Sequence, residues 1–153
     1  MEKDIRILVV DDHQVVREGL RRLLELEADL KVVGEAANAK EALNQVELLS
    51  PEVILMDIKM PEMDGIELAR RVKQKYPSSN IIMLTLYDEY LTQAMEAGAK
   101  GYLVKDIKRE ELIQAIRQVH RGQVVISESI ISKTQFEHED KDGKEAEEGS
   151  SKM

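Results

Sequence analysis

The 153-residue sequence contains no cysteine, and aromatic residues make up only 3% of it. The absence of cysteine excludes a disulfide framework, a thiolate zinc site and a cysteine nucleophile. Because 42% of the residues are hydrophobic but so few are aromatic, the core must be built from aliphatic side chains. No apolar run approaches the roughly 20 residues that a membrane-spanning helix needs, and residues 1–4 are too charged to open a signal peptide. We therefore expect a soluble, cytoplasmic protein with one compact domain.

Positive charge is also in deficit, since 22 Lys and Arg residues stand against 30 Asp and Glu residues, for a net charge of −8. Binding to a nucleic-acid backbone needs basic patches, so this balance argues against it. The acidic excess is strongest in residues 136–153, which hold seven acids and three bases. This segment has too few apolar residues to offset the entropy lost on ordering, and we predict a disordered acidic tail.

Short apolar runs alternate with amphipathic stretches from residue 5 to residue 120. The apolar runs, which predict strands, are residues 5–10, 30–34, 53–56, 81–84 and 101–104. The amphipathic stretches, which predict helices, are residues 13–27, 39–49, 64–75, 88–97 and a fifth that ends at Gly122. Strands without polar alternation are buried on both faces, as in a parallel sheet covered by helices on both sides. The sequence thus predicts an α/β fold with a doubly wound parallel five-stranded sheet.

The residues at the strand ends are the candidates for function. In such a sheet, ligands bind at the carboxyl ends of the strands, near the point where the strand order reverses. Asp11 and Asp12 follow the first expected strand, Asp57 the third, Thr85 the fourth and Lys105 the fifth. Three carboxylates, one hydroxyl and one ammonium group are therefore expected in a single cleft.

Three carboxylates in one cleft repel one another. At an effective dielectric constant near 20, two unit charges 4 Å apart interact by about 4 kcal/mol. One lysine offsets only part of this repulsion, so either one acid keeps a proton or a divalent cation binds. Oxygen ligands without histidine or cysteine suit Mg²⁺. Beside such an ion, a carboxylate can attack phosphorus and form an aspartyl phosphate.

Four segments resemble the receiver domain of bacterial two-component response regulators, a resemblance that covers about residues 4–121. These segments are LVVDDH, VILMDIKMPEMDG, IIMLT and AGAKGYLVKD. Within that family, DDHQVVREGLRRLL and GYLVKD are similar to the NarL/FixJ (LuxR-type) subfamily, with Asp106 where other subfamilies usually have proline. The resemblance implies a flavodoxin-like (CheY-like) strand order, 2-1-3-4-5.

The resemblance also implies roles for the strand-end residues. Asp57 would accept a phosphoryl group from a phosphohistidine of a sensor kinase, and Lys105 would bind the phosphate. Thr85 and Tyr102 resemble the switch pair, and Gly65 resembles a residue that shapes the loop after the acceptor. The implied Mg²⁺ ligands are Asp11, Asp12, Asp57 and the backbone carbonyl of Lys59. The chain would then be a phosphoacceptor in transcription regulation, which assists its own phosphorylation and slow autodephosphorylation, rather than an enzyme.

Three residues beside the expected pocket differ from the family pattern or occupy its variable positions. Leu86, directly after Thr85, is bulkier than the small residue usual there, which predicts narrower access to Asp57. Lys59 and Tyr87 lie two residues past Asp57 and Thr85, where they resemble the family's tuners of dephosphorylation. We hypothesise that both side chains screen the attacking water.

The C-terminal part departs further from the subfamily, whose members continue into a helix-turn-helix DNA-binding domain. We predict a receiver domain over residues 1–121, the start of a linker over residues 122–135, the acidic tail over residues 136–153, and no DNA-binding domain. DNA or membrane binding by this chain itself is not expected. The chain is either a stand-alone receiver or a fragment of a transcriptional regulator.

Other functions remain open at this point. A pseudo-receiver would bind partners without phosphorylation. A phosphohydrolase of the haloacid-dehalogenase type would need a second aspartate where Lys59 stands. A flavin-binding module would need a phosphate loop in place of Asp11 and Asp12.

Dimerisation that depends on phosphorylation is a further expectation. An exposed apolar seam could be formed by Ile113, Val119, Val15 and Leu20. For Val119 and Leu20, packing in the core is at least as good an interpretation. His13 is predicted to be an exposed residue at the start of a helix, with no catalytic role.

Overall fold

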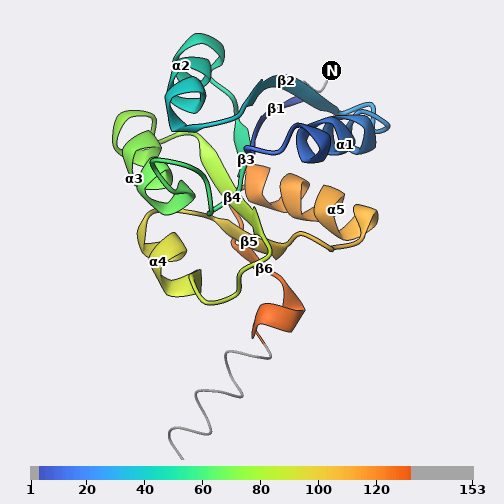
Figure 1. Cartoon of the computed structure of the whole chain (residues 1–153). Coiled ribbons are helices and arrows are strands. Elements are labelled where there is room, and N and C mark those ends of the chain that lie inside the picture. Colours follow the sequence, from blue (N-terminus) through green and yellow to red (C-terminus); the bar gives the residue numbers. More distant parts are fainter. Residues whose placement is uncertain (1–3, 132–153) are drawn as a thin grey trace, which may run out of the picture.

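Six parallel strands form one sheet in the computed structural model, which describes residues 4–131 (Figure 1). The strand order is β2-β1-β3-β4-β5-β6, and every neighbouring pair is parallel. The strands are β1 (Ile5–Val10), β2 (Leu30–Ala36), β3 (Val53–Met56), β4 (Asn80–Thr85), β5 (Gly101–Val104) and β6 (Val125–Ile126). The predicted parallel sheet and the order of its first five strands are confirmed. The order reverses between β1 and β3, so the ligand-binding crevice is expected at their carboxyl ends.

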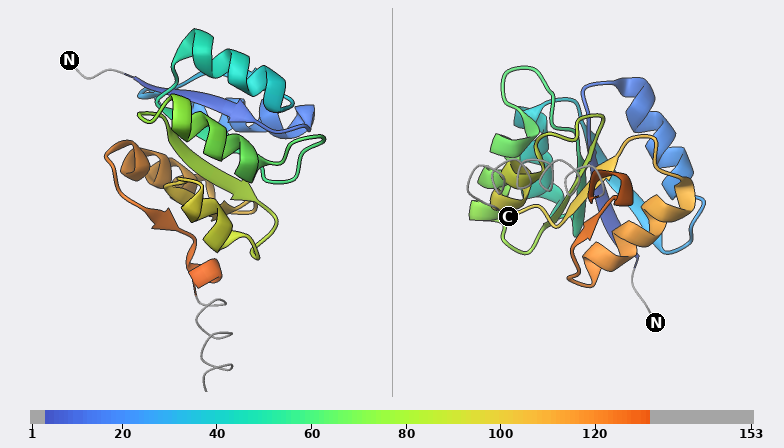
Figure 2. Two further views of the ribbon diagram at one scale, coloured as in Figure 1. Left: turned by 90° about the vertical axis from the view of Figure 1, so that its left-hand side faces the viewer. Right: turned by 90° about the horizontal axis from the view of Figure 1, so that it is seen from below.

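Helices cover both faces of the sheet, as Figure 2 shows most clearly in its right-hand view. The helices are α1 (Gln14–Leu24), α2 (Ala39–Leu49), α3 (Gly65–Lys75), α4 (Leu91–Glu96) and α5 (Arg109–His120). Side chains of α2, α3 and α4 pack with one set of strand residues, including Leu8 and Ile54, in one core cluster. Side chains of α1 and α5 pack with the opposite set, including Ile7 and Leu55, in a second cluster. Because successive strand residues point to opposite faces, each strand contributes to both cores.

Local signals in the sequence set the helix starts. The side chain of Asn38 accepts a hydrogen bond from the Glu41 amide and caps α2, as its residue type predicts. Asp64 caps α3 in the same way through the Glu67 amide. The predicted helix over residues 88–97 is shorter in the structure, because the Tyr90 amide is hydrogen-bonded to the Tyr102 hydroxyl and α4 begins only at Leu91.

The prediction of five strands is wrong by one, because β6 pairs with the outer edge of β5. The Val125 amide donates to the Lys100 carbonyl at 2.9 Å, and the Ser127 amide donates to the Tyr102 carbonyl at 3.0 Å. Ile130 is buried in the core at 1% exposure. The apolar run of this two-residue strand is too short for the sequence pattern to distinguish it from the start of a linker. Residues 132–135 and the predicted acidic tail, residues 136–153, lie outside the described residues.

The proposed apolar seam is wrong for two of its four members. Val119 is fully buried and Ile113 is 3% exposed, since both lie on the face of α5 that packs against the sheet. Leu20 is half-buried against the same core, and only Val15 projects into solvent. Among residues 4–131, no helix is both long and apolar enough to cross a membrane.

Candidate functional site

Asp11 and Asp57 lie side by side at the point where the strand order reverses. Val10 and Met56 are partners in the β1–β3 ladder, so the aspartate that follows each strand stands at the same level. The Asp57 amide donates to the Val10 carbonyl at 3.0 Å and fixes this alignment. Both aspartates are buried, with exposures of 2% for Asp11 and 5% for Asp57. The fold thus holds two carboxylates close together in a largely dry environment.

Lys105 bridges these two carboxylates. Its Nζ atom lies 2.8 Å from Asp11 Oδ2 and 3.0 Å from Asp57 Oδ2. The Lys105 amide donates to the Thr85 carbonyl at 2.9 Å, so the ladder between β4 and β5 positions the lysine. The second carboxylate oxygen of Asp57, Oδ1, accepts the Ile58 amide at 2.7 Å. The predicted convergence of Asp11, Asp57 and Lys105 is therefore observed.

The charges of this group stabilise one another. Burial alone would raise the pKa of Asp11, but hydrogen bonds from Lys105 and from the backbone and ring of His13 outweigh it, so the pKa lies below its usual value. Burial alone would lower the pKa of Lys105, but its hydrogen bonds to Asp11 and Asp57 hold that pKa above the usual value. The ammonium group and the Asp11 carboxylate are thus both charged at neutral pH.

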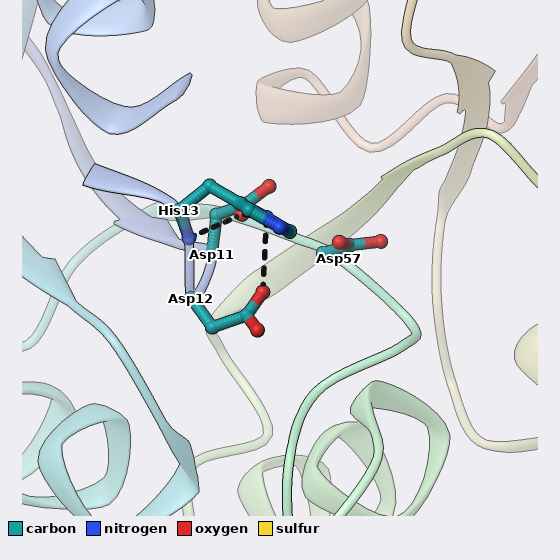
Figure 3. Close-up of side chains that lie close together, drawn as sticks. All are labelled: Asp11, Asp12, His13 and Asp57. Carbon is teal, nitrogen blue, oxygen red and sulfur yellow. Dashed lines mark hydrogen bonds and ion pairs between the residues drawn. The ribbon is translucent and has the colours of Figure 1, made fainter. Parts of the chain in front are cut away.

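Asp12 adds the third carboxylate, and its surroundings suit a metal ion. Its Oδ1 atom is buried without a hydrogen-bond partner, and His13 Nδ1 lies 3.1 Å from it. One ligand atom from each of Asp11, Asp12, His13 and Asp57 lies within 4.8 Å of the others (Figure 3). A buried carboxylate oxygen without a hydrogen bond is costly unless a cation satisfies it. The three carboxylates therefore fit a hard dication such as Mg²⁺.

The loop after Asp57 is packed against the start of α3. The Gly65 amide donates to the Ile58 carbonyl at 2.7 Å. A Cβ atom on Gly65 would lie 2.2 Å from the backbone oxygen of Asp57 and 3.0 Å from the Ile58 Cα atom. Glu62 in the same loop has a φ of 72°, in the left-handed region that is uncommon for a residue with a side chain. The absence of a side chain at position 65 allows this loop to hold Asp57 in place.

The predicted switch residues, Thr85 and Tyr102, are both fully buried and both hold the loop between β4 and α4. Thr85 Oγ1 accepts the Tyr87 amide at 3.1 Å. The Tyr102 hydroxyl donates to the Tyr87 carbonyl at 2.5 Å and accepts the Tyr90 amide at 3.3 Å. Burial raises the pKa of Tyr102 to about 12. The backbone of this loop is therefore attached to the end of β4 and to β5.

The side chains at positions 59, 86 and 87 lie outside the buried group. Lys59 is exposed, and its Nζ atom lies 4.8 Å from the centre of the Tyr90 ring and 5.5 Å from that of Tyr87. This contact joins the loop after β3 to the loop after β4. Leu86, which was expected to narrow access to Asp57, is 73% exposed.

Sequence reasoning placed no functional weight on His13, which the structure places beside the carboxylates. The residue is exposed at the start of α1, as predicted, but its ring nitrogen Nδ1 lies 2.9 Å from Asp11 Oδ1. The available signal was its position directly after the acidic pair. That position alone does not determine where the ring points.

The model of the response regulator receiver domain matches residues 7–117. The chain belongs to this receiver family. The receiver is 46% identical over 129 residues to the uncharacterized transcriptional regulatory protein YhcZ of Bacillus subtilis, a match that covers 83% of this chain and 60% of YhcZ. It is 36% identical to the nitrate/nitrite response regulator protein NarL of Escherichia coli over 126 residues, 81% of this chain and 58% of NarL.

A solved structure supports the same assignment. A LuxR-family two-component response regulator from Aurantimonas sp. has a TM-score of 0.84 and 36% identity, covering 89% of this chain and 99% of that one. The chain is thus a receiver domain of the NarL type, a family of signalling proteins. The pseudo-receiver, phosphohydrolase and flavin-binding alternatives are not favoured. The chain spans less than two thirds of the length of the two curated relatives named above.

Proposed function

We propose that Asp57 accepts a phosphoryl group from a phosphohistidine of a sensor kinase. The observation that carries this proposal is the contact of Asp57 Oδ2 with Lys105 Nζ at 3.0 Å, in a pocket that also holds Asp11 and Asp12. The pocket combines a carboxylate nucleophile, a fixed cation and oxygen ligands for a dication, which are the groups that phosphoryl transfer needs. No other described cluster of acids and histidine combines them.

In the proposed reaction, a carboxylate oxygen of Asp57 attacks phosphorus and forms an acyl phosphate. The bond between phosphorus and the imidazole nitrogen of the donor breaks, and that nitrogen keeps the electron pair and then takes a proton from solvent. Lys105 stays near the oxygen of Asp57 and offsets the charge that gathers on the phosphoryl oxygens. The Thr85 hydroxyl, when released from the Tyr87 amide, donates a hydrogen bond to one of these oxygens.

The metal in this proposal is Mg²⁺, held by the carboxylates of Asp11, Asp12 and Asp57 and by the backbone carbonyl of Lys59. When bound, the ion supplies positive charge to the phosphoryl oxygens. The chain itself contributes the burial that strengthens these charge interactions and the fixed position of Asp57. We also propose that slow hydrolysis by water returns the aspartyl phosphate to the free acid.

The signal would reach a partner through the loop between β4 and α4. Movement of Thr85 towards the phosphoryl group breaks its hydrogen bond to the Tyr87 amide. The carbonyl of the same residue accepts a hydrogen bond from the Tyr102 hydroxyl. The two switch residues therefore bind the same residue, Thr85 through its backbone amide and Tyr102 through its carbonyl. We propose that this change controls a partner or dimer surface of α4, β5 and α5 in a protein that regulates transcription.

Phosphorylation with a small donor tests the proposal directly. Incubation with acetyl phosphate and Mg²⁺, followed by intact mass spectrometry, should add one phosphoryl group to the receiver. The adduct should be lost in Asp57→Ala and with excess EDTA, and retained in Asp64→Ala, which changes a nearby helix cap. An adduct that persists in Asp57→Ala would refute the proposal, and turnover of a phosphoester would support a hydrolase instead.

A further inference from the structure

His13 turns its ring into the acidic pocket although the residue begins a helix. It is the N-cap of α1, with φ −103° and ψ 114°, and its side chain makes no capping hydrogen bond. Its amide instead donates to Asp11 Oδ1 at 2.9 Å, and its ring nitrogen Nδ1 lies 2.9 Å from the same oxygen. The backbone contact and the ring contact together hold the imidazole beside the carboxylates, as Figure 3 shows.

The spacing of these atoms is that of neighbouring ligands around one ion. A dication with octahedral bonds of about 2.1 Å holds adjacent ligand atoms about 3 Å apart. Nδ1 of His13 lies 2.9 Å from Asp11 Oδ1 and 3.1 Å from Asp12 Oδ1. The same Asp12 oxygen is buried and has no hydrogen-bond partner. One ion could therefore contact both carboxylates and the imidazole without large movement of any of them.

The chemistry of the imidazole then decides which ion the pocket binds more tightly. Mg²⁺ prefers oxygen ligands and gains little from nitrogen, whereas Co²⁺, Ni²⁺ and Zn²⁺ bind imidazole well. We propose that His13 Nδ1 is a metal ligand that makes this pocket selective for nitrogen-preferring dications such as Ni²⁺ over Mg²⁺. This inference rests on the metal site of the proposed function and adds a fourth side chain to it. The ring is 64% exposed, so an ion can reach it from solvent.

A different role for His13 predicts the opposite result. If the ring acts as a cation that offsets Asp11 and Asp12, it competes with every dication. Its removal would then strengthen the binding of Mg²⁺ and Ni²⁺ alike. If the ring only orients Asp11, its removal would lower the affinities for both ions by the same factor. The ratio of the two affinities therefore separates a ligand from either alternative.

The test measures Mn²⁺ binding to the full chain by electron paramagnetic resonance, with Mg²⁺ and Ni²⁺ as competitors. His13→Ala should lower the affinity for Ni²⁺ at least about tenfold. Loss of a residue that only hydrogen-bonds to a metal ligand typically costs about 10–100-fold, so the loss of a direct ligand should cost at least the lower figure. The same variant should change the affinity for Mg²⁺ by less than about twofold. Spin-echo spectra of bound Mn²⁺ should show nitrogen modulation in the parent chain and lose it in His13→Ala.

Two control variants keep the other histidines out of the result. His120→Ala changes a ring at the end of α5, where Nε2 lies 3.5 Å from Glu52, and His138→Ala changes a histidine in the acidic C-terminal segment. Both should behave like the parent chain. An unchanged ratio of Ni²⁺ to Mg²⁺ affinity in His13→Ala overturns the inference and leaves the Mg²⁺ site intact. A parent chain that binds neither ion overturns the metal site of the proposed function as well.

Discussion

Substitution of Gly65 by alanine should destabilise this receiver, although alanine normally favours a helix over glycine by about 0.5–1 kcal/mol. The added Cβ would lie 2.2 Å from the Asp57 carbonyl oxygen, where ordinary contact begins at 3.4 Å. The backbone around Asp57 must therefore move away by about an ångström, because the carbonyl oxygen belongs to the backbone and not to a flexible side chain. Overpacking of this kind costs about 1–3 kcal/mol. After the gain in helix preference is subtracted, we expect a net loss of up to about 2.5 kcal/mol in the free energy of unfolding.

Urea unfolding followed by circular dichroism measures this loss. With a denaturant slope of about 2 kcal/mol per molar urea, the midpoint should fall by up to about 1.2 M. Gly19→Ala is the matched control, because that glycine lies within α1 and a Cβ there would meet nothing within 4 Å. Its midpoint should rise by about 0.25–0.5 M at the same slope. The two alanine variants are thus expected to shift in opposite directions.

Phosphorylation gives a second measurement of the same change. Displacement of the Asp57 carbonyl moves the carboxylate relative to Lys105, so the initial rate with acetyl phosphate should fall in Gly65→Ala and stay unchanged in Gly19→Ala. A Gly65→Ala variant whose urea midpoint equals or exceeds that of the parent would refute the packing argument. It would show that the loop relaxes at no cost.

Two further predictions concern the aromatic residues near the pocket. Between pH 10 and pH 12 folded Tyr102 keeps a proton that the unfolded chain loses, because its pKa is raised to about 12. The stabilisation that Tyr102 contributes is therefore complete below pH 10. As the pH rises from 10 to 12, the free energy of unfolding should fall by up to about 1.4 kcal/mol per pH unit. Urea midpoints of the parent and of Tyr102→Phe on both sides of pH 10 test this, and parallel pH profiles would contradict it. Lys59→Asn should shorten the lifetime of the aspartyl phosphate by about two- to five-fold, since an exposed cation–π contact contributes about 0.5–1 kcal/mol. Phosphate release measures that lifetime. Lys75→Asn, which removes a similar contact with Tyr76 far along the chain, serves as the control, and an unchanged lifetime in Lys59→Asn would disprove the screening role.

The positions of the main strands and of the acidic pocket were predictable because both follow from simple patterns. Fully apolar runs mark strands that are covered on both faces, and a parallel sheet delivers all its strand ends to one edge. Asp11, Asp57 and Lys105 meet for that reason, and their contacts needed no fine detail of side-chain packing. The roles assigned to Asp57, Thr85 and the other site residues stay predictions until they are measured.

The features that the sequence did not predict depend on contacts between distant segments. β2 runs on past Gly34, where its pairing with β1 changes register between Ile7 and Leu8. β6 exists because the edge of β5 offers free backbone groups, a condition that no local run of residues reveals. The direction of the His13 ring depends on the backbone angles at a helix start. Each of these features requires knowledge of what lies opposite in space.

The parallel direction of β6 decides where the polypeptide goes next. Since β6 runs alongside β5 in the same sense, the residues after Ile126 leave the sheet at the edge where Asp57 lies, not at the opposite edge. The departing segment is tied to the two backbone groups of β5 that flank Leu103, because Ser127 donates its amide to the Tyr102 carbonyl and accepts the Val104 amide through its hydroxyl. A shift of β5 would therefore pull directly on this exit segment. β6 therefore couples any displacement of β5, the strand that carries Tyr102, to the residues that follow Ile126.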